Sequence, residues 1–217
     1  MNKNMIKLKL QKSDMDKIKC KVTCNRTLLK NYFYLLDSLF NPNTQVVSND
    51  YNVLICNENN MNRVFIDSSD KITSFKFIFR IYFSSEQLIV KYKNITLEQP
   101  LISALITVNN YFIDNHIDKK IEIELNNNIN SILEDYDSII DEVKKIYLEI
   151  ISEDYGYLRF DRDYKNTCEI FHPQYHIDIF YENNNSIKFG FSSDISIEAL
   201  KDLIHKDTKC AYLSYPN

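Results

Sequence analysis

The sequence predicts a single α+β domain in which a mostly antiparallel sheet, or two, is packed with about four helices. Two observations predict this class. Amphipathic segments at helical spacing are separated by segments rich in β-branched and aromatic residues, and the 217-residue chain can bury a core without disulfides or metals. The chain has no repeat and no linker. We expect one domain over residues 1–217; if two lobes form, the division is expected near residues 117–128.

The first 25 residues are expected to form an extended, lysine-rich lead-in. Residues 1–30 carry nine basic side chains against two acidic ones, whereas the whole chain has a net charge of −4. Such a segment is typical either of a basic arm that touches phosphates or an acidic partner, or of a solvated edge strand with protective lysines. The lysines that would bind a partner are Lys7, Lys9, Lys12, Lys17, Lys19 and Lys21.

The first helix is predicted over residues 26–40. Its apolar residues recur at helical spacing, Asn25 is the expected N-cap, and Pro42 follows its end. Strands rich in β-branched and aromatic residues are predicted next, over residues 63–67, 75–83 and 87–92. The short polar spacer 84–86 predicts that the last two form a hairpin.

Two further helices and a short strand are predicted in the middle of the chain. Residues 97–116 carry an apolar helical stripe, with Pro100 in the first turn, where proline is tolerated. Residues 119–125 alternate isoleucine and leucine with glutamate, which predicts a half-buried strand. Residues 127–153 show apolar positions at 3-4 spacing opposite charged ones, which predicts one amphipathic helix of about six or seven turns. We expect it to pack on the sheet of its own domain, with a coiled-coil interface as the alternative.

The last third of the sequence is predicted to form strands and a closing helix. A tight asparagine turn is expected at residues 183–185, because asparagine tolerates the left-handed conformation that hairpin turns require. The closing helix is expected over residues 196–206, with Ser196 at its start. The strands are predicted over residues 155–163, 167–171, 175–182 and 186–192.

Composition excludes several classes of site. With two glycines in the chain, no glycine-rich loop can cradle a phosphate, and no serine elbow, HExxH or CxxC motif is present. The five scattered cysteines favour free thiols in a reducing compartment. The sequence shows neither a signal peptide nor an apolar stretch of membrane-spanning length, so we expect a cytoplasmic protein with no membrane partner.

A polar cluster near the C-terminus is the strongest candidate site. Because alternate residues of a strand share a face, Arg159 and Asp161 are expected to point the same way. The same argument places His176 and Asp178 together on the next strand. If the two faces coincide, these four side chains converge, with His172 at the loop that enters the second strand.

This cluster has several interpretations. A histidine–carboxylate pair beside Arg159 can act as a general base next to an anion-stabilising charge. His172, His176 and Asp178 can hold a divalent metal for phosphodiester hydrolysis. The side chains can also form ion pairs on a solvated sheet face, or a polar face that binds a partner. The catalytic set under the enzymatic interpretations is Arg159, Asp161, His172, His176 and Asp178.

Two short motifs carry a family resemblance. Residues 158–163 read Leu-Arg-Phe-Asp-Arg-Asp, and residues 172–178 read His-Pro-Gln-Tyr-His-Ile-Asp. Followed by a strand at 187–189 and a helix from Ser196, they resemble a family of uncharacterised bacterial proteins, a domain of unknown function, with an FDxD…HPxxHLH motif. The family's last histidine is Asp178 here. The resemblance implies a phage-defence or mobile-element context and assigns no reaction.

Our leading hypothesis is a non-enzymatic, cytoplasmic protein that binds a protein partner or a second copy of itself, in a phage-defence or toxin–antitoxin system. The absence of a recognised catalytic motif, the long amphipathic helix and the basic arm favour it, and the arm leaves contact with nucleic acid open. One alternative is a metal-dependent nuclease or phosphoesterase that uses His172, His176 and Asp178, the only hypothesis here that needs a cofactor. Another is a phage or viral protein that blocks a host or defence factor.

Overall fold

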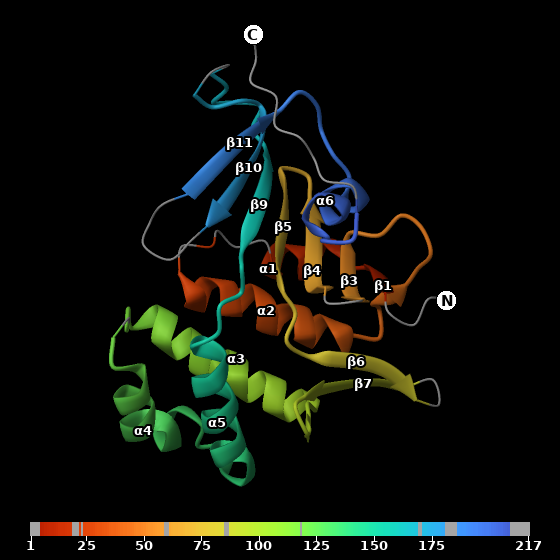
Figure 1. The fold of residues 1–217 in the computed structure, drawn as a ribbon. Helices are drawn as coiled ribbons and strands as arrows, with labels where there is room; N and C mark the ends of the chain where they lie inside the picture. The colour runs from red at the N-terminus through yellow and green to blue at the C-terminus, as the bar shows by residue number, and fades with distance from the viewer. Residues whose placement is uncertain are drawn as a thin grey trace. The chain divides into compact units, whose positions relative to one another are not determined.

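The elements of the computed structural model fall into two compact units (Figure 1). The first unit is drawn from residues 1–8, 46–77 and 155–217, and the second from residues 9–45 and 78–154. The stretch 117–128, where a division into lobes is predicted, falls inside the second unit. The structure describes residues 5–18, 22, 24–58, 61–84, 87–117, 119–168, 171–180 and 186–208.

Antiparallel strands and helices together confirm the α+β class. Within the described residues there are an eight-stranded sheet, a three-stranded sheet and six α-helices, so the expectation of about four helices was too low. None of the helices in this part of the chain is both long enough and apolar enough to cross a membrane.

The large sheet has the strand order β11–β10–β9–β5–β4–β3–β1–β2. β9 pairs with β5 on one side and with β10 on the other, so strands from the two ends of the sequence form one continuous surface. Four of the strands predicted for this region are confirmed, with shifted ends. The strands are β1 (Met5–Lys9), β2 (Gln45–Val46), β3 (Val53–Glu58), β4 (Met61–Ser68), β5 (Lys71–Lys76), β9 (Leu158–Arg162), β10 (Tyr175–Phe180) and β11 (Ser186–Phe191).

One prediction for the sheet was correct in part, one was wrong where the structure describes it, and one lies outside the described residues. The extended lead-in is confirmed over residues 5–9, which form β1 inside the sheet, but residues 12–18 form helix α1 (Lys12–Ile18). Of the strand predicted over residues 167–171, the described residues 167, 168 and 171 belong to no strand, and an isolated bridge joins Cys168 to His172. Just before this bridge, the Asp163 carboxylate accepts hydrogen bonds from the backbone N–H groups of Lys165 and Asn166 and stabilises a turn after β9. The asparagine turn at 183–185 falls outside the described residues.

One face of the sheet packs against helix α6 (Ile197–Ile204). Ile197 and Leu200 of the helix join a buried cluster with Phe65, Phe160 and Ile177 of the strands. The helix begins where the sequence predicts, because the Ser196 hydroxyl accepts the Ala199 backbone N–H at 3.2 Å. Phe160 and Ile177 alternate along their strands with the polar residues of the candidate site, which therefore lie on the opposite face.

The second unit contains the remaining helices and the small sheet. The predicted helices 26–40 and 97–116 are confirmed as α2 and α3, and the predicted hairpin is confirmed as β6–β7. The strand predicted over 75–83 is divided between β5 and β6. The elements are α2 (Asn25–Leu39), β6 (Arg80–Ser84), β7 (Gln87–Tyr92), β8 (Ile95–Thr96), α3 (Gln99–Asp114), α4 (Ile121–Ile132) and α5 (Ile140–Ile151).

Helix α2 starts one position earlier than predicted. Its N-cap is Cys24, not Asn25, and the backbone N–H of Cys24 donates to the Thr27 hydroxyl at 3.1 Å. The threonine therefore satisfies a backbone group at the helix start, which a sequence pattern centred on Asn25 did not reveal.

The strand at 119–125 and the single helix at 127–153 were both wrong. The chain forms α4, a turn with a short 3₁₀ segment at Asp137–Ile139, and α5. The alternating isoleucines do not mark a strand, since Leu125 and Ile129, one helical turn apart, are the buried residues of α4. After Leu133 the chain turns, with backbone hydrogen bonds from the Tyr136 N–H to the Leu133 carbonyl and from the Ile139 N–H to the Tyr136 carbonyl.

Candidate functional site

The strand register brings four of the five predicted catalytic side chains together on the sheet face opposite α6. β9 and β10 pair so that Asp161 lies across from His176 and Arg159 lies across from Asp178. All four are at least partly buried, and His176 has only 1% of its surface exposed. The convergence depends on this register, because a one-residue slip would turn either pair to the other face.

Arg159 links the two carboxylates. Its Nε donates to Asp161 at 2.7 Å, and its second terminal nitrogen donates to Asp178 at 2.9 Å. Burial by itself lowers the pKa of Arg159, but hydrogen bonding to Asp161 and the charges of the two aspartates raise this pKa above its ordinary value. Arg159 is therefore a fixed positive charge that orients both aspartates.

The ring of His176 is oriented by a backbone carbonyl. Its Nδ1 lies 2.8 Å from the Pro173 oxygen, and because a carbonyl only accepts hydrogen bonds, Nδ1 carries the hydrogen. The other nitrogen, Nε2, is buried without a hydrogen-bond partner and lies 3.3 Å from Asp161 and 3.9 Å from Asp178. The Nε2 atom therefore faces two carboxylates, an arrangement that a cation bound between the three groups would stabilise.

Three donor groups surround that position. Asp161, His176 and Asp178 each offer one ligand atom, and these atoms all lie within 4.8 Å of one another. The Oδ1 atom of Asp178 is also buried without a hydrogen-bond partner, although Lys188 Nζ approaches it at 3.6 Å. We call these three residues the cation site. One imidazole nitrogen and two carboxylates suit Zn²⁺ or Mn²⁺ better than the all-oxygen preference of Ca²⁺ or Mg²⁺.

His172 lies beside the cation site and is already engaged at both ring nitrogens. Its Nε2 is 2.9 Å from Asp163, and its Nδ1 is 3.2 Å from the ammonium of Lys188. Because an ammonium only donates, Nδ1 accepts and the Nε2–H donates to Asp163. The ring centroids of His172 and His176 are 4.6 Å apart. The geometry thus groups Asp161, in place of His172, with His176 and Asp178.

Asp163 and Lys188 are parts of this region that sequence reasoning missed. Backbone N–H groups of Asn166 and Lys165, and then the bond to His172, lower the pKa of Asp163 well below its ordinary value. Asp163 shares the predicted strand motif with Asp161, which was the available signal. Nothing local marks Lys188, which reaches the site because β11 pairs Lys188 with Asp178.

One of the two glycines in the chain lies directly across from His176. A Cβ atom on Gly190 would lie 2.8 Å from Pro173 Cγ and 3.3 Å from its Cβ. Glycine therefore lets Pro173 lie over β11, where its carbonyl holds the His176 ring.

Replacing Gly190 with alanine is expected to displace Pro173 and lower the free energy of unfolding by about 1–3 kcal/mol. Urea denaturation measures this loss. The double variant Gly190→Ala with Pro173→Ala removes the closest clashing atom, and part of the stability should return. An unchanged midpoint in the single variant would show that the loop shifts without cost.

The predicted basic arm is folded. Lys7 and Lys9 belong to β1, and Lys12 and Lys17 belong to α1, whereas Lys19 and Lys21 lie outside the described residues. The Lys7 ammonium lies 4.4 Å above the Tyr51 ring and 3.9 Å from Glu198, and Lys17 pairs with Asp14 at 3.6 Å. These contacts hold Lys7 and Lys17 against neighbouring side chains.

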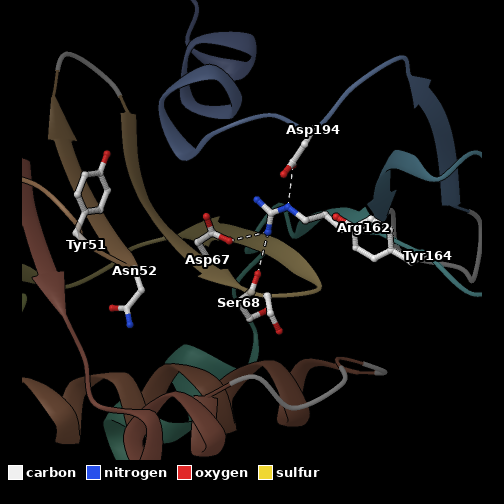
Figure 2. A pocket seen from close by; sticks show the side chains of 8 residues that line it. Tyr51, Asn52, Asp67, Ser68, Arg162, Tyr164 and Asp194 are labelled. Carbon is white, nitrogen blue, oxygen red and sulfur yellow. Dashed lines mark hydrogen bonds and ion pairs between the residues drawn. The ribbon is translucent and has the colours of Figure 1, made fainter.

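A second polar feature, a pocket of about 390 Å³, is associated with Arg162 (Figure 2). Arg162 donates to Asp67 at 2.7 Å, to the Ser68 carbonyl at 2.8 Å and to Asp194 at 2.8 Å. Its side chain is 9% exposed, and these bonds join the end of β4 to the segment that leads into α6. Arg162 is therefore a structural clamp. The pocket is lined by Tyr51, Asn52, Asp67, Ser68, Ser69, Arg162, Tyr164 and Asp194.

Arg162→Ala is expected to lower the free energy of unfolding by about 1–3 kcal/mol, less than for a fully buried pair because Asp194 is 46% exposed.

This loss of stability should depend on pH. Burial raises the pKa of Asp67, and Arg162 opposes that rise. A carboxyl with a raised folded pKa favours folding when protonated and loses that contribution as the pH rises through the folded pKa. Without Arg162 the pKa rises further, so the deficit should be larger at about pH 8 than at about pH 5. Arg162→Lys, which keeps the charge, is the control; a pH-independent deficit would contradict the role of Asp67.

Comparison with known proteins does not identify a related site. No family model, no curated protein and no solved structure matches the chain. The resemblance to a family of uncharacterised bacterial proteins stays a prediction, and the function has to be argued from the side chains themselves.

Proposed function

We propose that the protein is a metal-dependent phosphoesterase whose divalent ion is bound by Asp161, His176 and Asp178. One observation carries the proposal: the buried Nε2 of His176 has no hydrogen-bond partner and lies between two carboxylates. Its Nδ1–H is fixed by a backbone carbonyl, the usual outer contact of a histidine that ligates a metal.

The surrounding charges suit a phosphate once a metal ion is bound. The two aspartates are balanced by Arg159 and Lys188, so a divalent ion would give the site a net positive charge and make it attractive to a phosphate. It would also polarise a phosphoryl oxygen and lower the pKa of a bound water. Lys188, 32% exposed and 3.6 Å from Asp178, is placed to add a further positive charge beside the phosphate.

The other hypotheses stay predictions with less support. The long amphipathic helix that favoured a non-enzymatic partner-binding protein is two helices, and Lys7 of the basic arm is held within the sheet. Neither a phage-defence or toxin–antitoxin partner nor a blocked host factor is tested by this geometry. The metal hypothesis has the more specific observation behind it.

Calorimetric titration of the metal-free protein with Mn²⁺ and Zn²⁺ tests the proposal. We expect one ion to bind per chain, and Asp161→Asn, Asp178→Asn and His176→Gln each to abolish that binding. His116→Gln, a change at a turn after α3, is the matched control. Circular dichroism of each variant separates loss of the site from loss of the fold. Equal binding in all variants, or no binding by the wild type, would overturn the proposal.

A further inference from the structure

The pocket at Arg162 lies on the sheet face that carries α6 (Figure 2). Arg162 alternates with Asp161 along β9, so the pocket and the cation site lie on opposite faces of the sheet. The pocket volume of about 390 Å³ falls within the range of sites that hold small molecules, but no aliphatic side chain is among the lining residues that the structure describes. Such a lining suits a ligand rich in hydroxyl groups.

The ion pair of Asp67 with Arg162 has one acceptor and one donor to spare. Among the described residues, the carboxylate of Asp67 is bonded through Oδ1 alone, and its side chain is 31% exposed, so Oδ2 can accept from a ligand. Nη2 of Arg162 makes a single bond within the same part of the chain, to the Ile195 carbonyl at 3.4 Å. Its second hydrogen can therefore donate to a ligand.

A vicinal diol, which has hydroxyls on two neighbouring carbons, matches this pair. Because a hydroxyl both donates and accepts, one hydroxyl can donate to Oδ2 of Asp67 while the other accepts from Nη2 of Arg162. Acidic side chains accept a hydrogen bond from a ribose hydroxyl in dinucleotide-binding proteins. Asp67 and Arg162 already hold each other at 2.7 Å, so little ordering is needed when a ligand binds.

The charges of the pocket favour a neutral ligand. A phosphate would be repelled by the carboxylate of Asp67, and an ammonium group by the guanidinium of Arg162. Burial, together with the negative charges of Asp194 and Glu198, raises the pKa of Asp67. A further negative charge beside Asp67 is therefore unfavourable.

An exposed aromatic ring completes the pocket. Figure 2 shows Tyr51 on one side of the Asp67–Arg162 pair and Tyr164 on the other. Tyr164 is 62% exposed and meets the ring of Tyr175 edge to face at 6.2 Å, which steadies it. Its ring offers an apolar surface on which the C–H groups of a ligand ring can pack.

We infer that the pocket binds a neutral sugar ring through a vicinal diol, with the hydroxyls on Asp67 and Arg162 and the ring against Tyr164. The inference is independent of the cation site and of the proposed hydrolysis. A simple glycoside and a nucleoside both carry this diol, so the experiment compares the two.

NMR titrations of the metal-free protein with adenosine, 2′,3′-dideoxyadenosine and methyl β-D-ribofuranoside test the inference. Both ligands that carry the diol are expected to bind. Removal of both hydroxyls should weaken the binding of adenosine by about 10-fold or more, the effect of losing a hydrogen bond to a charged group. Tighter binding of adenosine than of the ribofuranoside identifies a nucleoside as the ligand, and equal binding identifies the sugar alone.

Two variants locate the binding. Asp67→Asn replaces an acceptor with a donor and should weaken the binding of adenosine by about 10-fold or more. Tyr164→Ala should also weaken it. The controls are Asp202→Asn, the same change in an exposed ion pair on α6, and Tyr82→Ala, at another exposed tyrosine, and both should bind adenosine like the wild type.

The outcomes are separate from those of the metal titration. Absence of binding by both diols, equal binding of adenosine and dideoxyadenosine, or unchanged binding in Asp67→Asn overturns the inference and leaves the phosphoesterase proposal standing. The comparison of adenosine with dideoxyadenosine uses the wild type, so it decides the question even if a variant fails to fold. Absence of Mn²⁺ binding defeats the proposed function and leaves this inference standing.

Discussion

Replacing Arg159 with methionine is expected to lower the free energy of unfolding by about 3–5 kcal/mol, because it leaves the buried Asp178 and the half-buried Asp161 without their shared positive charge. Arg159 is 19% exposed, Asp161 16% and Asp178 8%, so water screens the remaining negative charges poorly. Methionine keeps much of the side-chain volume, which separates loss of charge from loss of packing. Guanidinium chloride denaturation of both proteins in the absence of metal measures the difference.

Two controls sharpen this measurement. Arg80→Met changes an exposed arginine on β6 and should have little effect on stability. Mn²⁺ should restore part of the stability of Arg159→Met, since an ion that binds the folded state stabilises it by mass action. A loss below about 1 kcal/mol would mean that the aspartates are neutral or solvated, contrary to the arrangement described for them.

Replacing Asp178 with asparagine is expected to reduce the rate of hydrolysis of a chromogenic phosphodiester by about 100-fold or more. Loss of a residue that only supports a metal ligand costs about 10- to 100-fold in activity, so loss of a ligand itself should cost at least as much. The change keeps the shape of the side chain but removes the negative charge and one ligand oxygen. Asp178 is also bonded to Arg159, so the variant disturbs the orientation of the other carboxylate. Initial rates with saturating Mn²⁺ measure the effect.

Asp194→Asn provides the matched control for this prediction. It makes the same chemical change at Arg162, on the face that carries α6, and should leave hydrolysis within about twofold of the wild type, as expected for a change remote from the site. Full activity in Asp178→Asn would exclude the cation site as the centre of hydrolysis. Equal losses in both variants would point to a general loss of folded protein, which thermal unfolding would reveal.

Local patterns were sufficient for much of the fold and for part of the site. Helices α2, α3 and α6 each carry an apolar stripe that the sequence shows directly, and β10 and β11 are marked by β-branched and aromatic residues. Strand alternation alone placed Arg159 with Asp161, and His176 with Asp178. Their meeting depends on the register of β9 with β10, which local sequence does not determine.

The failures have physical causes of two kinds. The apolar residues keep their 3-4 spacing from Ile129 to Ile150, although a turn separates helix α4 from helix α5. The spacing hides the turn, because the apolar residues on both sides of it are buried. The turn between the two helices is closed by backbone hydrogen bonds at Tyr136 and Ile139, which the periodicity of apolar residues does not measure. Lys188 and Gly190 reach the site through strand pairing, so only the assembled sheet reveals their part in it.

The pairing of β5 with β9 has a consequence for synthesis on the ribosome. β5 ends at Lys76, whereas its neighbour begins at Leu158, so the nascent chain holds an open strand edge while the whole segment between them is translated. The second unit, drawn from residues 9–45 and 78–154, is fully synthesised by then and can fold first. The cation site forms only after residue 178 has left the exit tunnel, so we expect metal to bind after folding and to leave the early steps unaffected.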